Sequence, residues 1–503
     1  MTGNPGEPRV STLSLVRQQA AVAAGDQHTV DAAVRVLRAG GNAIDAAVAA
    51  GFAAAVTEPC LTSLGGGGFL LHRDATGASR LFDFFVDAPG RGLADSALAA
   101  PHFEPITLRF AGTTQTFHCG YGSVAVPGVL TGYLHAHARL GRIPLQDVVE
   151  PAIELARDGF LLSQAQASIL TLLMSIITST PEAANVFGTY ANASGNGDLA
   201  TNHLYAGFLD ELADAEPGDP APGWQKRLVE AMERNEGLIT AEDLAAYRAI
   251  EREPLGFELS DASVLTNPSP SFGGMIVGEA LTGAFNGRPT GEQPDAVPML
   301  QALARATANG KRHTDNAPTS VRGTTQISII DGDGGIVSMT TSNGSCSGVM
   351  IPGTGIQLNN MMGEADLHPH GFHRTEPGTR IASMMAPSIL AWPDGSSAAV
   401  GSGGSERIRS AIVQVACSLL AGDDAAVSVD APRFHLADDG VVQAEPGISS
   451  ERLLPVAGTW PVNEWPARDL YFGGANVVHR DALGRLQAAG DPRRGGASAV
   501  IDL

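Results

Sequence analysis

One stretch past the middle of the chain constrains the fold most: two apolar, β-branched runs flank a turn. Residues 323–330 read Gly-Thr-Thr-Gln-Ile-Ser-Ile-Ile, and residues 336–344 read Ile-Val-Ser-Met-Thr-Thr-Ser-Asn-Gly. Between them, residues 331–335 supply the Asp and Gly that accept positive φ angles. The pattern predicts a β-hairpin, and Thr324 opens its first strand directly after Gly323.

That threonine has a possible chemical role. If the bond between Gly323 and Thr324 were cut, Thr324 would carry a hydroxyl nucleophile and a free α-amino group in one residue. An α-amino group titrates at about 7.7–8.0 and can act as the base without a histidine. Gly-Thr-Thr before a strand is nevertheless ordinary, so the stretch taken alone favours a structural role.

Composition limits the classes of function. The chain has 503 residues, 44% of them hydrophobic and 17% charged, and its net charge of −21 argues against nucleic acid and anionic membranes as partners. No run approaches the roughly 18 apolar residues of a membrane span, and no basic-then-apolar leader pattern begins the chain. We therefore expect a cytoplasmic protein. Four widely spaced cysteines predict isolated buried thiols rather than disulfides or a metal site: Cys60, Cys119, Cys346 and Cys417.

Periodicity and capping signals predict a mixed α/β architecture with helices outside sheets. Helices are expected at residues 30–37, 129–140, 145–157, 224–235 and 240–247, and another from the cap Asn42 to Val56. Strands are expected after the glycines 65–68 and at residues 81–86. Residues 185–223, rich in Gly, Asn, Asp, Pro and Ala, are expected to form a loose surface insertion. No internal repeat or linker divides the chain.

Two stretches after the hairpin could line a site. Residues 400–408, Val-Gly-Ser-Gly-Gly-Ser-Glu-Arg-Ile, form a glycine loop before a helix, which suits an anion or oxyanion but also a plain strand-to-helix turn. Residues 351–364 are polar and rich in turns, which is typical of a pocket wall or of a surface loop.

A third stretch is rich in histidine. His368, His370 and His373 lie near Glu364 and Asp366, a combination that can bind a metal ion. The Pro and Gly between the histidines break any regular helix face, so no metal site is expected.

Several ordered motifs carry a resemblance to a known family. They are Gly40-Gly41-Asn42-Ala43-Ile44-Asp45-Ala46-Ala47, Gly65 to Phe69, Val126-Pro127-Gly128, Leu155-Ala156-Arg157-Asp158-Gly159-Phe160, Gly237-Leu238-Ile239-Thr240, Asp243-Leu244-Ala245-Ala246-Tyr247, Pro352-Gly353-Thr354-Gly355, Ala431-Pro432-Arg433-Phe434-His435 and Asp491-Pro492-Arg493-Arg494. From about Val22 to Arg494 the chain resembles the γ-glutamyltransferase (glutathione hydrolase) family of N-terminal-nucleophile hydrolases.

The resemblance implies an α+β fold, a four-layer αββα sandwich, made from a precursor that cuts itself in two. The cut would give a large (α) segment, 1–323, and a small (β) segment, 324–503, intertwined in one domain. No cofactor or metal is implied. The processed subunits are expected to stay associated, and a homodimer of heterodimers is one assembly that they could form.

The resemblance also assigns catalytic roles. Thr324 matches the nucleophile, and Gly403 and Gly404 match the oxyanion-hole pair. The run Thr341-Ser342-Asn343 matches the region that supplies a hydroxyl to the nucleophile and an asparagine to the substrate. Thr341 and Asn343 are the residues expected to take these two roles.

The expected substrate pocket departs from the family. Phe85 stands where typical members carry an Arg that grips the glutamyl α-carboxylate, and Met361 replaces a substrate-binding Gln. The family's paired serines become Ala382 and Ser383, while Glu364 keeps the carboxylate that binds the α-amine. The pocket is therefore expected to be apolar and poorly suited to a glutamyl group.

Three functions follow from this comparison. The first is a self-processing amide hydrolase or acyltransferase that acts on a small amide or peptide-like substrate with a non-glutamyl acyl group. The second is a true γ-glutamyltransferase or glutathione hydrolase in which Arg380 or Arg407 binds the carboxylate. The third is an unprocessed, inactive binding scaffold.

Overall fold

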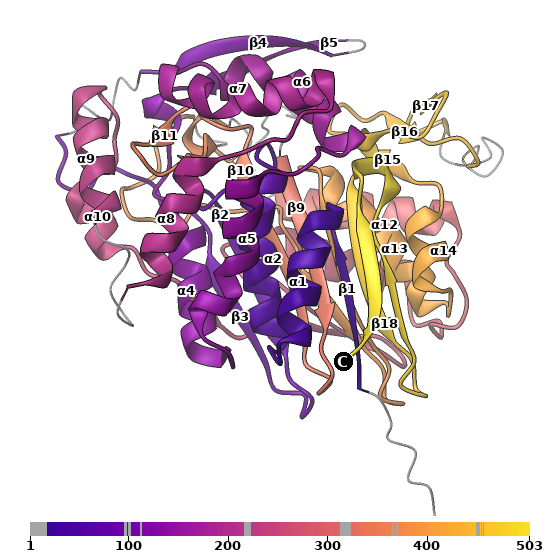
Figure 1. Ribbon diagram of the computed structural model, residues 1–503. Coiled ribbons are helices and arrows are strands. Elements are labelled where there is room, and N and C mark those ends of the chain that lie inside the picture. Colours follow the sequence, from indigo (N-terminus) through magenta and orange to yellow (C-terminus); the bar gives the residue numbers. More distant parts are fainter. Residues whose placement is uncertain are drawn as a thin grey trace, which may run out of the picture.

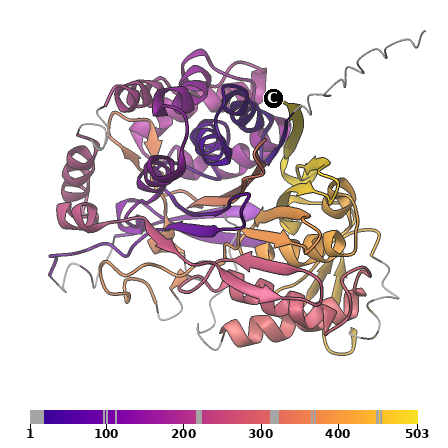
Figure 2. The ribbon, with the colours of Figure 1, turned by 90° about the horizontal axis from the view of Figure 1, so that it is seen from below.

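Four layers make up the molecule: helices, two stacked β-sheets, and helices again (Figure 1). Figure 2, seen from below, shows the two sheets lying between the helical layers. The computed structural model describes residues 18–94, 98, 102–110, 113–215, 223–311, 323–364, 367–368, 371–448, 453, 455 and 457–503.

The first sheet contains the predicted hairpin. In the described part of the chain it has seven antiparallel strands, in the spatial order β20 (Ala497–Asp502), β1 (Gln19–Ala24), β9 (Gly323–Ile330), β10 (Ile336–Gly344), β2 (Gly67–Arg73), β3 (Ser79–Phe84) and β6 (Ile250–Arg252). The hairpin strands β9 and β10 lie at its centre and are buried along their whole length.

The second sheet lies against the first. Its six antiparallel strands within the described ranges follow the order β19 (Leu486–Ala489), β18 (Gly474–Arg480), β14 (Ser397–Gly403), β13 (Ser388–Ala391), β8 (Ser263–Thr266) and β7 (Leu255–Glu258). Strands β14 and β18 contact β9, and Gly403 at the end of β14 lies against the Thr324 carbonyl oxygen, so both sheets reach the start of the hairpin.

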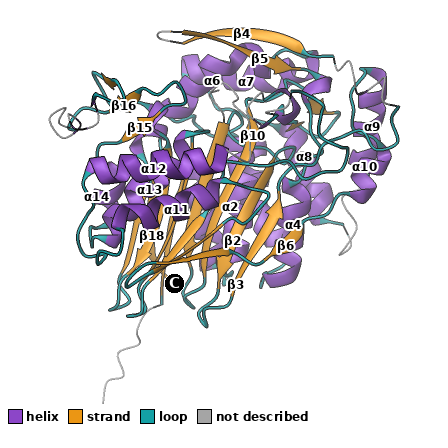
Figure 3. Ribbon diagram, turned by 180° about the vertical axis from the view of Figure 1, so that it is seen from behind, coloured by secondary structure: helices purple, strands orange, loops and turns teal. Residues whose placement is uncertain are grey.

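Helices cover both outer faces. The first sheet is covered by α1 (Gln27–Arg38), α2 (Ala43–Thr57), α4 (Val129–Leu140), α5 (Leu145–Asp158) and α8 (His203–Ala213) (Figure 1). The second is covered by α11 (Gly273–Phe285), α12 (Ala296–Lys311) and α13 (Arg407–Leu420) (Figure 3). Around this sandwich lie α6 (Gln164–Ile177), α7 (Pro181–Asn196), α9 (Trp224–Arg234), α10 (Ala241–Ala246) and α14 (Ala425–Asp430). Three small sheets formed by described residues lie there too: β4 (Glu104–Phe110) with β5 (Thr113–Cys119), β11 (Met350–Ile351) with β12 (Ile356–Gln357), and β15 (Phe434–Leu436) with β16 (Val442–Ala444) and β17 (Val462–Glu464). No helix among the described residues is long and apolar enough to cross a membrane.

Polar side chains join the two sheets below the start of β9. Gln326 Nε2 donates to Ser338 Oγ at 3.0 Å, and Asn476 Nδ2 donates to the Gln326 carbonyl oxygen at 2.7 Å. Ser328 Oγ donates to the Asn476 carbonyl oxygen at 2.9 Å, and Ser338 Oγ donates to that of Val400 at 3.1 Å. Buried polar groups must find partners, so this network fixes how the sheets stack.

The prediction of a loose insertion at 185–223 is wrong for most of that stretch. Helices α7 and α8 occupy it, and residues 216–222 lie outside the described residues. Tyr190 and Tyr205 anchor the two helices, because their hydroxyls donate to carbonyl oxygens of α2, those of Val56 at 3.0 Å and Phe52 at 3.1 Å. Tertiary packing thus overrides a local composition that favours loops.

Candidate active site

The hairpin places Thr324 at the start of a central strand. In the register of β9 and β10, Ile330 pairs with Ile336 and Thr324 pairs with Ser342. Thr324 is buried, with 4% of its surface exposed. Its side chain and that of Ser342 share one face, because directly opposed residues of an antiparallel pair project the same way.

Ser342 connects the threonine to the peptide bond before it. Thr324 Oγ1 donates to Ser342 Oγ at 3.4 Å, and Ser342 Oγ donates to the Gly323 carbonyl oxygen at 2.5 Å. The Gly344 backbone N–H donates to Ser342 Oγ at 3.1 Å and fixes its position. The Gly323 carbonyl is therefore polarised beside a hydroxyl that can attack it.

Thr341 lies on the other face of the sheet. It pairs with Thr325, and its Oγ1 accepts a hydrogen bond from Thr62 Oγ1 at 2.9 Å. Side chains alternate along a strand, so Thr341 cannot face Thr324. The geometry thus does not place Thr341 where the resemblance expects a hydroxyl, and Ser342 occupies that position.

Asn343 is buried near the hairpin but does not line the cavity beside Thr324. Its Nδ2 donates to the Leu358 carbonyl oxygen at 3.4 Å and to Cys346 Sγ at 3.7 Å. Its Oδ1 is buried without a hydrogen-bond partner among the described residues. The expected role in substrate binding stays a prediction.

A cavity that we call the front cavity lies beside the Thr324 hydroxyl. It is lined by Phe85, Thr324, Ser342, Gly344, Met361, Glu364, Leu367, Ser383, Met384, Met385, Ser405 and Ile408. The structure therefore brings together the predicted nucleophile and the predicted substrate-binding residues Phe85, Glu364 and Ser383. Most of the other lining side chains are apolar, as the sequence predicts.

Phe85 is buried, with 2% exposed, and stacks on Phe69 with ring centroids 5.5 Å apart. Arg380 lies behind it: its Nη1 donates to the Phe85 carbonyl oxygen at 2.7 Å and to Asp83 Oδ1 at 2.9 Å. Arg380 Nε is 2.7 Å from Asp87 Oδ1. Two carboxylates thus occupy this guanidinium, and it is not among the lining residues of the front cavity.

Arg407, the other candidate cation, also lies outside that lining. Its Nε donates to the Tyr471 carbonyl oxygen at 3.1 Å, and its guanidinium lies 4.7 Å from the centroid of the Tyr471 ring. Neither arginine therefore reaches the place where the resemblance puts a carboxylate.

Glu364 and Ser383 are held by hydrogen bonds from neighbouring residues. Glu364 Oε1 accepts hydrogen bonds from Ser345 Oγ at 2.9 Å and from the Ser345 backbone N–H at 3.0 Å. Ser383 Oγ accepts a hydrogen bond from the Met385 backbone N–H at 3.1 Å. Both side chains are therefore ordered at the wall of the front cavity.

The glycine loop before α13 approaches the nucleophile from the second sheet. A Cβ atom at Gly403 would come within 2.2 Å of the Thr324 carbonyl oxygen, so only glycine fits there. Gly404 follows with φ +124°, and Ser405 has φ +55° and lines the front cavity. Serine rarely adopts a positive φ, so the local sequence does not predict this backbone conformation. The contact of Ser405 with the front cavity was therefore not predicted.

Part of the histidine-rich stretch is described. Asp366 and His370 lie outside the described residues, whereas the His368 ring Nε2 lies 2.9 Å from the Met361 carbonyl oxygen. Within the described ranges, no three His, Cys, Asp or Glu side chains are grouped as a metal ion would require.

Comparison with known proteins gives the family. A model of the family described as gamma-glutamyltranspeptidase matches residues 29–309 and 295–501. The glutathione hydrolase proenzyme of Escherichia coli (strain K12) is 29% identical over 541 residues, covering 95% of this chain and 90% of that protein. The acylase ACY 1 proenzyme of Pseudomonas sp. (strain SE83) is 30% identical over 501 residues, covering 88% and 87%.

A solved structure confirms the fold. The crystal structure of cephalosporin acylase from Bacillus halodurans superposes with a TM-score of 0.76 at 22% identity and covers 99% of both chains. The predicted αββα sandwich is therefore confirmed. The family match and the hydrolase and acylase relatives place the chain in the class of N-terminal-nucleophile hydrolases and acyltransferases. Within that class, the chain belongs to the gamma-glutamyltranspeptidase family.

Proposed function

We propose that this chain cuts itself between Gly323 and Thr324, and that Thr324 then acts as the nucleophile of an amide hydrolase or acyltransferase. We further propose that its acyl donor lacks the α-carboxylate of a glutamyl group.

The contact of Ser342 with Gly323 carries the first part. In the precursor, Thr324 Oγ1 attacks the Gly323 carbonyl carbon, and the carbonyl oxygen becomes an oxyanion that Ser342 Oγ already contacts at 2.5 Å. The Gly323–Thr324 C–N bond breaks, and the nitrogen takes up the hydroxyl proton. Water then hydrolyses the ester, which leaves a Gly323 carboxylate and a free Thr324. The names of the two relatives support this step, because both proteins are called proenzymes.

The sheet order supports continued association of the two fragments. Strand β1 of the large segment lies between β20 and β9 of the small segment, and β10 pairs with β2 of the large segment. Separation of the fragments would break three strand pairs of the first sheet: β1 with β20, β1 with β9, and β2 with β10. We therefore expect the processed subunits to remain one unit.

The lining of the front cavity supports the second part. A γ-glutamyl donor would bring a carboxylate against Phe85, and Arg380 and Arg407 are committed elsewhere. A buried charge without a partner costs about 2–5 kcal/mol, which corresponds to roughly thirtyfold to five-thousandfold in kcat/KM.

Self-cleavage is tested with denaturing gels. The purified protein should give two fragments, and the smaller should begin at Thr324 by N-terminal sequencing. Thr324→Ala should remain a single chain of 503 residues, because it lacks the attacking hydroxyl. A wild-type chain that stays intact through prolonged incubation would refute the mechanism and favour a binding scaffold.

The acyl donor is tested with a matched series of p-nitroanilides: γ-glutamyl, 4-aminobutanoyl, glutaryl and butanoyl. Donors without a carboxylate should exceed the γ-glutamyl donor in kcat/KM by about a thousandfold. Phe85→Arg should reduce the difference in kcat/KM between these donors and the γ-glutamyl donor, whereas the neutral control Phe85→Met should not. If the γ-glutamyl donor is best and Phe85→Ala leaves its rate unchanged, the protein is a true γ-glutamyltransferase.

A further inference from the structure

A second cavity, which we call the rear cavity, lies behind the start of β9. Its volume is about 10 Å³, about the smallest that holds one water molecule. It is lined by Gly25, Glu58, Leu61, Thr324, Thr325, Gln326, Gly474, Asn476, Asp491, Arg494 and Gly496. Of these residues, only Thr324 also lines the front cavity.

The backbone nitrogen of Thr324 points toward the rear cavity. In an antiparallel strand, the N–H and C=O of one residue point to the same side. The Thr324 carbonyl oxygen faces Gly403, whose strand partner Gly474 lines the rear cavity. The hydroxyl of Thr324 therefore serves the front cavity, and the α-amino group freed by cleavage would face the rear one.

Glu58 is the titratable group of the rear cavity that matches this amine. It follows α2 and is fully buried; its Oε2 accepts from Thr325 Oγ1 at 2.6 Å, and its Oε1 accepts from Thr29 Oγ1 at 2.9 Å. No cationic side chain of the described residues pairs with it. Burial, and then the charge of Asp26, raises the pKa of Glu58 to about 8. An α-amino group titrates in the same range, at about 7.7–8.0.

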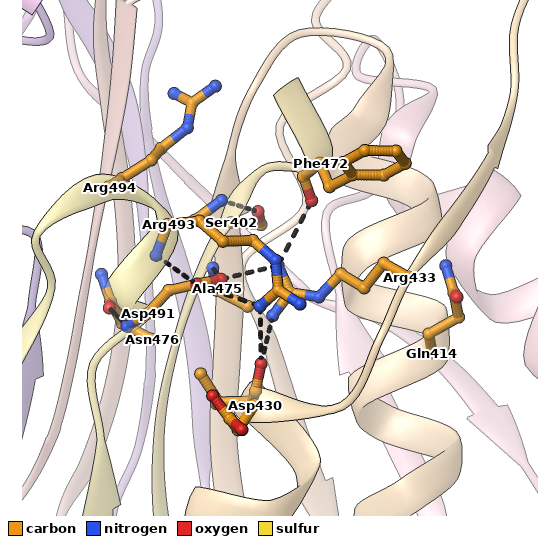
Figure 4. Close-up of polar contacts among 12 residues, drawn as sticks. Ser402, Gln414, Asp430, Arg433, Phe472, Ala475, Asn476, Asp491, Arg493 and Arg494 are labelled. Atoms are coloured by element: carbon orange, nitrogen blue, oxygen red, sulfur yellow. Dashed lines mark hydrogen bonds and ion pairs between the residues drawn. The ribbon is translucent and has the colours of Figure 1, made fainter. Parts of the chain in front are cut away.

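The other charged groups that line the rear cavity are Asp491 and Arg494, and each keeps its charge near neutrality. Arg433 Nη1 donates to Asp491 Oδ2 at 2.6 Å, and Figure 4 shows Asp491 turned toward that guanidinium and Arg494 directed away from both. Burial by itself raises the pKa of Asp491, but Arg433 and Arg493 outweigh burial and lower it, so this carboxylate stays ionised near neutrality. Burial lowers the pKa of Arg494 to about 10, which leaves it a cation.

Two more titratable groups face Glu58 from outside the rear cavity. Asp26 lies at the start of α1, and burial raises its pKa. The buried phenol of Tyr133 on α4 has a pKa raised by burial and, to a lesser degree, by Glu58, so it stays neutral. Neither group can serve as a cation for Glu58.

We propose that Glu58 shares a proton with the α-amino group that cleavage creates at Thr324; this inference rests on the self-cleavage proposed above. In the precursor, the Thr324 nitrogen is an amide and Glu58 holds the proton as a neutral acid. After cleavage, the proton moves between the Glu58 carboxyl group and the amine. In one state Glu58 is a neutral acid beside a free amine, and in the other it is a carboxylate beside an ammonium group. No net charge enters the buried site in either form.

This pairing sets the pH at which the base becomes available. A neighbouring carboxylate favours the ammonium form, so it raises the pH at which the free amine appears. Glu58 does not contact substrate and acts only through the amine, as a positioning residue. Glu58→Gln keeps the shape and removes the charge, so the acid limb of kcat/KM should move to lower pH by at least about one unit.

The pH profile of the most rapidly cleaved p-nitroanilide tests the inference on the processed enzyme. The limb should shift in Glu58→Gln and stay near the wild-type position in Glu58→Asp, which retains the carboxylate. Thr57→Val is a matched control: Thr57 Oγ1 lies 3.0 Å from Thr29 Oγ1, so it removes a hydroxyl of the same network without removing a charge. Its limb should not move. A cleaved, active Glu58→Gln enzyme with an unmoved limb would overturn the inference, whereas an uncleaved wild type would overturn self-cleavage instead.

A second measurement does not need an active Glu58 variant. The infrared band of a neutral carboxyl group, assigned by its loss in Thr324→Ala/Glu58→Gln, should be present in the Thr324→Ala precursor at pH 7. The band should weaken in the processed wild type, where the amine competes for the proton. Equal bands before and after cleavage, or no such band in the precursor, would overturn the inference.

Discussion

Removal of the Ser342 hydroxyl is the most direct test of the proposed self-cleavage. Ser342→Ala removes one group that donates to the Gly323 carbonyl oxygen at 2.5 Å and accepts from Thr324 Oγ1 at 3.4 Å. It leaves Thr324 itself unchanged. The substitution therefore asks whether the contact, rather than the threonine alone, drives the reaction.

The size of the effect follows from the role of that donor. Loss of one hydrogen bond to a developing oxyanion typically costs about 2.7–4 kcal/mol, or about 10²–10³ in rate. The neighbouring Thr341 provides the control, because its hydroxyl bonds Thr62 on the opposite face of the sheet. Thr341→Val loses one buried hydrogen bond, worth about 1 kcal/mol of folding stability, and should leave the cleavage rate within about threefold.

The assay follows the intact fraction on denaturing gels after rapid purification from short expression pulses. Wild type and Thr341→Val should be processed together, while Ser342→Ala should persist as the full-length chain for at least a hundred times longer. Thermal melts must show that both variants are folded. Cleavage of Ser342→Ala at the wild-type rate, or a greater delay in Thr341→Val, would refute the assignment.

Two further predictions concern the scaffold. Gly403→Ala would place a Cβ atom 2.2 Å from the Thr324 carbonyl oxygen, so it should lower the free energy of unfolding by about 1–3 kcal/mol and slow self-cleavage. Gly188→Ala is the control: no atom lies within 4 Å of the new Cβ, so it should not destabilise the fold. Burial by itself raises the pKa of Glu406, but His435, Arg409 and Arg407 outweigh it and bring the pKa from 4.5 to about 2. This depressed pKa contributes on the order of 3 kcal/mol of stability above pH 4.5 that is lost as the pH falls toward 2. Denaturant unfolding in a Thr324→Ala background should therefore show a difference between Glu406→Gln and the parent that shrinks below pH 4.5; a difference independent of pH would contradict it.

Local signals predicted much of the fold. Helix α4 spans Val129–Leu140, as the periodicity indicates, and Asn42 caps α2 with a full capping box. Both hairpin strands have the predicted bounds. In each case the deciding chemistry lies within a few residues: caps, turn residues, or an unbroken β-branched run.

Features that depend on distant partners could not be predicted in this way. Residues 185–223 contain the polar and glycine-rich composition of a loop, yet α7 and α8 form there because Tyr190 and Tyr205 bond to α2. The lining of the front cavity likewise depends on residues that are distant in the sequence. Apart from the resemblance, nothing in the sequence indicates that Phe85 and Ser383, almost 300 residues apart, line one cavity.

The choice between Thr341 and Ser342 depends on the turn rather than on either residue. With Ile330 opposite Ile336, counting back along the strands puts Thr324 opposite Ser342. A slip of one residue would bring Thr341 to that face and turn Ser342 away. Asp331 prevents the slip: its Oδ1 accepts from the backbone N–H of Gly335 at 2.8 Å, and its own N–H donates to the Gly335 carbonyl oxygen at 2.9 Å. A carboxylate in the turn, at the far end of the hairpin, therefore decides which hydroxyl the nucleophile meets.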